Sequence, residues 1–228
     1  MIHLPQVGFH LLAGGVLFAC VAVAAAQVDV PSGCLASIGG GLTSTEAQVR
    51  ALGTASFPEL ATVNISMHTF HSRADYFRTR FSVTRFLLPV RMRYFVDVNP
   101  TAFTQLAPSD GVCGVLAHEL SHVVALSRGN RLRRLGLIRL LSKSFTVQFE
   151  RKTDLEAIHR GYGDGLKSYR TWVYAHIPPD ALPSKRRNYF SPEEIDAIRA
   201  QLQKRPDLLS VWRKRAPTNL QEVLDGAK

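Results

Sequence analysis

The apolar residues between positions 112 and 159 recur at the spacing of α-helices and predict three consecutive helices. The first is expected from about Val112 to Ser127, and Arg128-Gly129 ends it. The second is expected to begin at Asn130, with an apolar stripe at three- and four-residue spacing formed by Leu132, Leu135, Ile138, Leu141 and Phe145. A third helix is expected from Val147 to His159. The middle of the chain is therefore predicted to be helical.

A segment before these helices has the composition and partial alternation of a β-strand. Residues 84–98 are rich in β-branched and aromatic side chains, and apolar and basic residues alternate in the order Val90, Arg91, Met92, Arg93 and Tyr94. Asn99-Pro100 stops the pattern. Residues 84–98 are thus predicted to form a strand.

Residues that cap helices and form turns mark further element boundaries. A short helix is expected from Thr45 to about Leu52, and another from the Ser191 cap to about Lys204, where Glu194 completes a capping box. Residues 108–111 predict a turn, and the three glycines between 161 and 165 predict a loop.

The first 28 residues contain no Lys, Arg, Asp or Glu, unlike the rest of the chain. This predicts a signal peptide over residues 1–26, or alternatively a retained membrane anchor over 7–26. A third alternative is a lipoprotein signal with Cys20 as the lipidated residue. Residues 27–42 are expected to be a flexible lead-in, and 43–228 one folded domain. We expect an exported protein, periplasmic or extracellular.

Removal of the signal would leave two cysteines, Cys34 and Cys113, in a compartment that permits disulfides. The two cysteines are expected to form one disulfide, and the alternative is that Cys113 is a small buried residue without a partner.

The net charge of +10 is concentrated in part in an acid-free stretch, residues 128–143, which carries five arginines and one lysine. An apolar stripe of this kind usually packs on its own core and leaves the basic face in solvent, and contact of that face with anionic lipid or a cell-wall polymer is the alternative. No motif that reads RNA or DNA accompanies the charge, so no nucleic-acid partner is expected.

The first predicted helix contains VLAHELSHVV, residues 115–124, with two histidines four positions apart. Residues at this spacing share one helix face, so His118 and His122 can direct imidazole nitrogens at one metal ion. Glu119 is rotated by about 100° around the axis and can take a proton from a water molecule at the metal. The motif therefore predicts two metal ligands and a general base.

A third ligand is needed, and Glu150 is the strongest candidate. Among the five glutamates after His122, only Glu150 has an aspartate four residues later, Asp154. On one helix face, Glu150 can ligate the metal while Asp154 accepts a hydrogen bond from the second nitrogen of a ligating histidine. Three protein ligands leave a position for water, as in catalytic zinc sites, so we expect one Zn²⁺ ion.

With these residues the sequence resembles the HExxH zinc metallopeptidases of the gluzincin type, and most closely the bacterial M48-like peptidases. The similarity covers roughly residues 90–165 and rests on His118-Glu119-Leu120-Ser121-His122 followed by Glu150-Arg151-Lys152-Thr153-Asp154. It implies His118, His122 and Glu150 as zinc ligands and Glu119 as general base, with Asp154 as the hydrogen-bond acceptor of a ligating histidine. The acidic motif departs from the group in lacking alanine before the aspartate. The resemblance implies an α+β, zincin-like fold, mostly helical with a small sheet beside the HExxH helix.

A peptidase also needs a group that stabilises the oxyanion, and Tyr162 and His176 are the leading candidates because they follow the ligand helix. The strand end Val96–Asn99 is expected either to pair with an extended substrate or to be an ordinary core strand. We therefore expect an exported zinc metalloendopeptidase acting on peptides or proteins. The alternative is a catalytically idle, zinc-stabilised envelope module with a binding or chaperone-like role.

Overall fold

The computed structural model describes residues 33–34, 41–82, 84–85, 90–128 and 143–226. Three sequence predictions lie outside these residues: the targeting segment 1–26, most of the lead-in 27–42 and the helix that was expected to begin at Asn130. The basic helix over 128–143 is therefore described only at its two ends. Within the described ranges, no helix has the length and apolar character needed to cross a bilayer.

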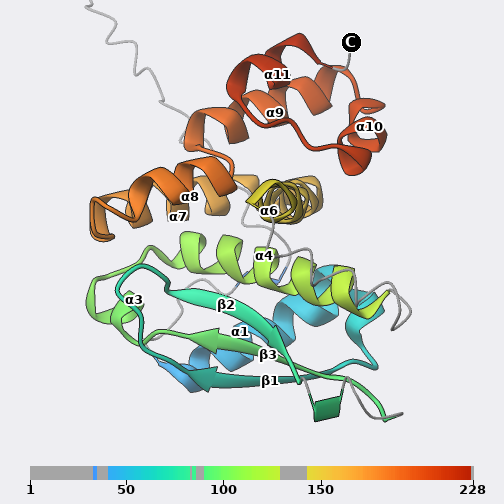
Figure 1. Cartoon of the computed structure of the whole chain (residues 1–228). Helices are drawn as coiled ribbons and strands as arrows, with labels where there is room; N and C mark the ends of the chain where they lie inside the picture. The colour runs from blue at the N-terminus through green and yellow to red at the C-terminus, as the bar shows by residue number, and fades with distance from the viewer. Residues whose placement is uncertain (1–32, 35–40, 83, 86–89, 129–142, 227–228) are drawn as a thin grey trace, which may run out of the picture.

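The fold is α+β and mostly helical, with a small three-stranded sheet in the lower layer of Figure 1. The strand order is β1-β3-β2. β1 (Asn64–Thr69) runs parallel to β3 (Arg93–Val98), and β2 (Phe77–Phe81) runs antiparallel to it. This agrees with the predicted fold class in its general form.

The strand predicted over residues 84–98 is confirmed only from Arg93 onward. Its pairing explains the late start, since β1 begins opposite Arg93 and β2 ends opposite Tyr94. Residues 90–92 pair with no described strand, and their composition alone does not sustain one. Thr84 and Arg85 are instead helical.

The position of β3 corrects the expectation that Val96–Asn99 pairs with a substrate. β3 is the central strand, and its backbone is paired with β1 on one side and β2 on the other. Both edges of β3 are used within the sheet, so it has none left for a peptide. β1 and β2 are the edge strands.

Two helices pack on the sheet and form the main core with it. They are α1 (Leu42–Ser56) and α4 (Ser109–Ser127), accompanied by the short helices η1 (Pro58–Leu60) and α3 (Thr101–Thr104). Alternate residues of β3 are buried in this core together with residues of α1 and α4, namely Tyr94, Val96, Val98, Leu52, Leu116 and Leu120.

The helix predicted to begin at Thr45 is α1, which begins three residues earlier, at Leu42.

Cys34 and Cys113 form a disulfide, with their Cα atoms 5.8 Å apart. Cys113 is buried near the start of α4, but its bond to Cys34 makes the alternative of an unpaired cysteine wrong. The bridge joins the beginning of the described chain to the helix that carries the two histidines.

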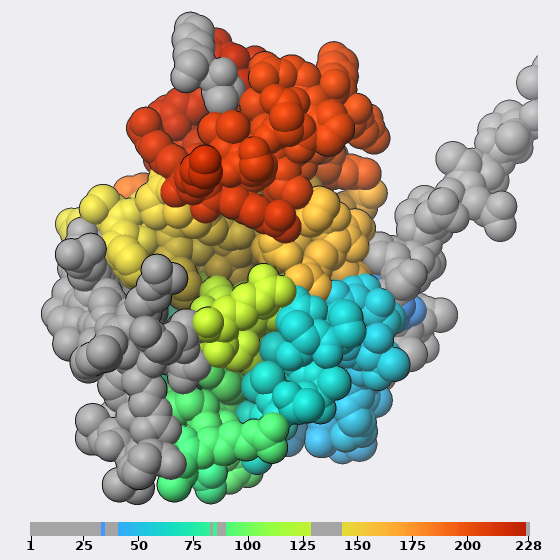
Figure 2. All heavy atoms as spheres, turned by 90° about the vertical axis from the view of Figure 1, so that its right-hand side faces the viewer, coloured from blue at the N-terminus to red at the C-terminus, as the bar shows by residue number. Residues whose placement is uncertain are grey.

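The upper layer in Figure 1 is entirely helical. It contains α6 (Lys143–Ala157), the π-helical turn η3 (Ile158–Tyr162), α7 (Gly163–His176), α8 (Leu182–Asn188), α9 (Pro192–Lys204), α10 (Leu208–Lys214) and α11 (Leu220–Asp225). The space-filling view shows the same stacking, with the C-terminal helices on top and the sheet layer below (Figure 2). α4 lies between the two layers.

Two predicted non-helical segments are helical. Ser109–Gly111, expected in a turn, form the first turn of α4. The expected loop at 161–165 continues as η3 and α7, and only Gly161 leaves helical geometry, with φ of 94°. Glycine permits loops but does not require them, and Gly165 here allows close packing against α4.

The helix predicted after Ser191 is confirmed as α9, including its capping box. Ser191 Oγ accepts from the Glu194 amide at 3.2 Å, and the Ser191 amide donates to Glu194 Oε2 at 2.8 Å. The helix predicted from Val147 is α6, which begins at Lys143 and is followed by the π-helical turn.

Candidate metal centre

The two histidines lie in the most buried helix of the lower layer, where α4 faces the helical layer. Every residue from Gly111 to Val124 is buried, because this helix packs on the sheet on one side and on α7 on the other. Close approach of α7 requires Gly114, where an added Cβ would overlap the backbone of Gly165 and Leu166. The position of α4 is thus fixed by packing against the sheet and α7.

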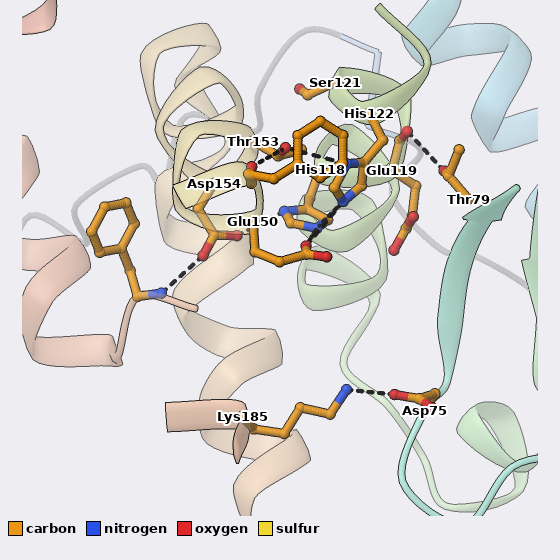
Figure 3. A network of polar contacts seen from close by, with 12 residues as sticks. Asp75, Thr79, His118, Glu119, Ser121, His122, Glu150, Thr153, Asp154 and Lys185 are labelled. Carbon is orange, nitrogen blue, oxygen red and sulfur yellow. Dashed lines mark hydrogen bonds and ion pairs between the residues drawn. The ribbon is translucent and has the colours of Figure 1, made fainter. Parts of the chain in front are cut away.

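His118, His122 and Glu150 converge from α4 and α6 (Figure 3). His122 Nε2 is 3.0 Å from His118 Nε2 and 3.0 Å from Glu150 Oε2, and His118 Nε2 is 3.4 Å from Glu150 Oε2. In a tetrahedral zinc site with bonds of about 2.0–2.1 Å, ligand atoms lie about 3.3–3.4 Å apart. These three side chains can therefore hold a metal ion.

The polar contacts behind the histidines determine which nitrogens face the position where a metal ion could bind. His118 Nδ1 is 2.7 Å from Asp154 Oδ1, to which it can only donate. His122 Nδ1 is 3.2 Å from Thr153 Oγ1, and that hydroxyl donates its own hydrogen to the Phe149 carbonyl at 2.8 Å. Thr153 must therefore accept from His122 Nδ1. In their neutral forms, both imidazoles carry the proton on Nδ1 and a lone pair on Nε2.

Two lone pairs 3.0 Å apart repel each other unless a cation lies between them. The surrounding carboxylates favour such a cation. Burial alone would lower the pKa of His118, but Asp154 and Glu150 outweigh burial and raise it to about 9. The pKa of Glu150 is held well below its usual range by the two histidines, although burial opposes this. The donor set thus fits a bound metal, which would replace the proton.

Asp154 connects this site to the helical layer. Its Oδ1 accepts from Arg170 Nη2 at 2.9 Å and lies 2.7 Å from His118 Nδ1, and its Oδ2 accepts from the Phe190 amide at 2.9 Å. Burial would raise the pKa of Asp154, but Arg170 and then His118 lower it. The contact between Asp154 and a ligating histidine, expected from the sequence, is present.

Glu119 lies beside the three ligands and does not join them. Its side chain is buried, and Oε2 has no hydrogen-bond partner among the residues that the structure describes. The Glu119 backbone carbonyl accepts from Thr79 Oγ1 at 3.0 Å, which ties α4 to the edge strand β2. A buried carboxylate oxygen without a donor is costly unless a ligand or water pairs with it.

The ligands open into a cleft of about 520 Å³ between β2 and the helical layer. Its lining comprises Asp75, Phe77, Arg78, Thr79, Arg80, Phe81, His118, Glu119, His122, Leu126, Phe149, Glu150 and Tyr189. An ion pair crosses from α8 to the segment before β2, with Lys185 Nζ 2.6 Å from Asp75 Oδ1 (Figure 3). The site is therefore open to a ligand larger than water.

Neither predicted oxyanion residue reaches this cleft. The Tyr162 hydroxyl donates to Ser56 Oγ at 2.5 Å on the α1 side of the molecule. His176 is exposed at the end of α7, where its ring stacks on Trp172 with centroids 4.6 Å apart. Following the ligand helix in sequence did not bring these residues to the candidate metal centre, and no residue of η3 or α7 lines the cleft.

Two residues that contact the site were missed by sequence reasoning. Thr153 Oγ1 accepts a hydrogen bond from His122 Nδ1. The position of Thr153 directly before Asp154 could have suggested that it lies near the site. Tyr189 lies in the cleft with its ring centroid 5.8 Å from that of His118 and 4.2 Å from the Arg170 guanidinium carbon. Burial raises the pKa of Tyr189 well above its usual value, so its phenol stays protonated. No spacing in the sequence identifies it.

Comparison with known proteins found no matching family model, no similar curated protein and no similar solved structure.

Proposed function

We propose that this protein is a zinc-dependent metalloendopeptidase with a zincin-like fold. One observation carries the proposal: two imidazoles with their Nε2 lone pairs directed at one point, completed by Glu150, beside a buried carboxylate oxygen without a partner. The resemblance to HExxH peptidases rests on the same residues. Two nitrogens and one carboxylate oxygen suit zinc and leave a position open for water.

Glu119 is the general base in this proposal. When bound, the zinc ion supplies Lewis acidity that polarises a peptide carbonyl and acidifies a water molecule. Glu119 accepts the proton of the attacking water and delivers it to the leaving amine. Its burial keeps the carboxylate close to the reacting atoms, and the Thr79 hydrogen bond to its backbone positions the helix turn that carries it.

Tyr189 is the residue that we assign to the oxyanion. Its ring lines the cleft near His118, and the guanidinium of Arg170 lies against the ring. A protonated phenol can donate a hydrogen bond to the developing negative charge. This assignment takes the place of Tyr162 and His176, which lie outside the cleft.

A peptide substrate is expected to pair with β2. This strand uses one edge for β3, and no other described strand pairs with its second edge, which borders the cleft. Strand addition would supply main-chain hydrogen bonds without sequence preference. The apolar side chains of Phe81, Leu126 and Phe149 line the cleft and favour a large apolar residue in the substrate.

Export is also part of the proposal. The Cys34–Cys113 disulfide supports an oxidising compartment, in keeping with a signal peptide over residues 1–26 or an anchor over 7–26. Contact with anionic lipid or a cell-wall polymer through residues 128–143 remains a proposal that rests on their charge.

The test is zinc stoichiometry measured together with cleavage of a peptide library. The wild type should bind one zinc ion and cleave, whereas Glu119→Gln should keep the zinc and lower kcat by about 10²–10⁴-fold. Glu46→Gln, an exposed glutamate in α1, is the matched control and should change neither. Cleavage by Glu119→Gln at the wild-type rate would remove Glu119 from the mechanism.

Glu150→Ala tests the third ligand directly. It should lose zinc by elemental analysis, and unchanged zinc affinity would show that Glu150 is not a ligand. Zinc binding by the wild type without cleavage of any peptide would favour the idle envelope module over the peptidase.

A further inference from the structure

A second cavity, of about 600 Å³, lies between α6, α8 and the segment after α10. Its lining residues are Ser144, Val147, Gln148, Lys152, Arg187, Lys214, Arg215 and Thr218. None of them lines the cleft at the metal centre. Lys152 is two residues from Glu150, or about 200° around the helix, so the two cavities lie on opposite faces of α6.

Four of the eight lining residues are cations, and none is an acid. Arg187, Lys214 and Arg215 form no ion pair with any described residue. The Lys152 ammonium, which is partly buried, donates to the Lys214 carbonyl at 2.5 Å rather than to a carboxylate. Like charges gathered around one cavity repel one another, and this repulsion is relieved when an anion enters.

None of the described acids lies within ion-pair distance of the four lining cations, although Glu222 and Asp225 line a neighbouring pocket together with Arg215. Glu194 pairs with Arg151, and Glu156 pairs with Arg160 and Arg213. Glu222 accepts from the amide and hydroxyl of Thr218. The positive charge of the cavity is therefore not neutralised by a neighbouring carboxylate within ion-pair distance in the described part of the chain.

We propose that this cavity binds a phosphate-bearing ligand. Two guanidinium groups and two ammonium groups supply the positive charge and the N–H donors that bind phosphate oxygens. The cavity volume is in the range of small-molecule sites, and it exceeds the volume that a single inorganic anion occupies. The phosphate can belong to a soluble molecule or to a lipid headgroup, and the experiment separates these sources.

The first arm titrates the full-length protein with inorganic pyrophosphate by calorimetry. Binding should be saturable and weaken as salt increases, and Arg187→Gln/Arg215→Gln should reduce the affinity about 10- to 100-fold. The control, Arg73→Gln/Lys204→Gln, removes two exposed cations that lie outside the cavity and should leave the affinity within about two-fold.

The second arm measures sedimentation with phosphatidylcholine vesicles, with and without phosphatidylglycerol. Binding that requires phosphatidylglycerol and is lost in Arg187→Gln/Arg215→Gln but not in the control pair assigns the ligand to a lipid headgroup. Binding of pyrophosphate alone assigns it to a soluble phosphate. The proposal is overturned if neither probe binds, or if both double variants weaken binding equally. Thermal unfolding of each variant verifies that it is folded.

Discussion

The sheet layer and the helical layer hold their metal-ligand helices in different ways. In the sheet layer, α4 is surrounded by apolar side chains such as Leu116 and Leu120 and is linked to Cys34 by a disulfide. In the helical layer, α6 is held by buried charges, with Arg151 paired to Glu194. One half of the site is positioned by apolar packing and the other by ion pairs.

This difference affects how precisely each ligand is held. Apolar packing is non-directional, so it can place α4 without orienting an imidazole ring. Contacts between polar groups are directional, and both histidines of α4 direct Nδ1 at an oxygen of α6, His118 at Asp154 and His122 at Thr153. The helical layer therefore orients the rings that the sheet layer positions.

Replacing Arg151 should give the largest loss of stability. Its guanidinium is buried and donates to Glu194 Oε1 at 2.9 Å and to the Pro217 carbonyl at 3.2 Å. Arg151→Met leaves the Glu194 carboxylate buried without its partner, so the free energy of unfolding should fall by about 3–5 kcal/mol. Urea denaturation measures this. Arg151→Met/Glu194→Gln should recover part of the loss, and no recovery would mean that packing rather than the ion pair holds α6.

Removing the disulfide should cost less. It closes a loop with a sequence separation of 79 residues, and Cys34→Ala/Cys113→Ala should lower the free energy of unfolding by about 2–4 kcal/mol. Denaturation of the wild type in reductant serves as the control and should show the same loss. Amide hydrogen exchange should rise more in α1 and α4 than in α9. An equal rise in exchange in all three helices would contradict the view that different interactions stabilise the two layers.

Gly114→Ala tests the contact between the layers. The added Cβ overlaps the backbone of Gly165 and Leu166, which cannot move aside as a side chain can, so we expect a loss of about 2–3 kcal/mol in thermal unfolding. Gly53→Ala is the matched control, because nothing lies within 4 Å of its added Cβ. That substitution in α1 should stabilise the protein by about 0.5–1 kcal/mol. Equal effects of the two substitutions would contradict the close contact.

Thr153→Val should change the free energy of unfolding least among these substitutions, and its effect should be confined to zinc binding. Valine preserves the shape but removes the oxygen that accepts from His122 Nδ1, so zinc affinity should fall about 10-fold with little change in stability. Competition with a chelator measures the affinity. Thr153→Ser should restore it. Wild-type affinity in Thr153→Val would mean that the packing of α4 orients His122 without help from α6.

The parts of the site that were predicted correctly depend on contacts within one helix. His118 and His122 are four residues apart on α4, and Glu150 and Asp154 four apart on α6, and each pair shares a face as helix geometry requires. The α9 capping box is similarly local. The predictions about the site that failed concern partners distant in sequence, since Tyr162 bonds to Ser56 and β3 is central instead of an edge.

The sequence by itself determined the ligand helices, their spacing and the residue types that a metal requires, because a periodicity of 3.6 residues places side chains on a face without reference to the rest of the chain. Only the tertiary structure decided which nitrogen of each histidine faces the candidate metal position, that β2 forms the edge beside the cleft, and that Tyr189 lies near His118. Those relations depend on how separate elements pack, and packing joins residues whose distance along the chain carries no signal of their contact.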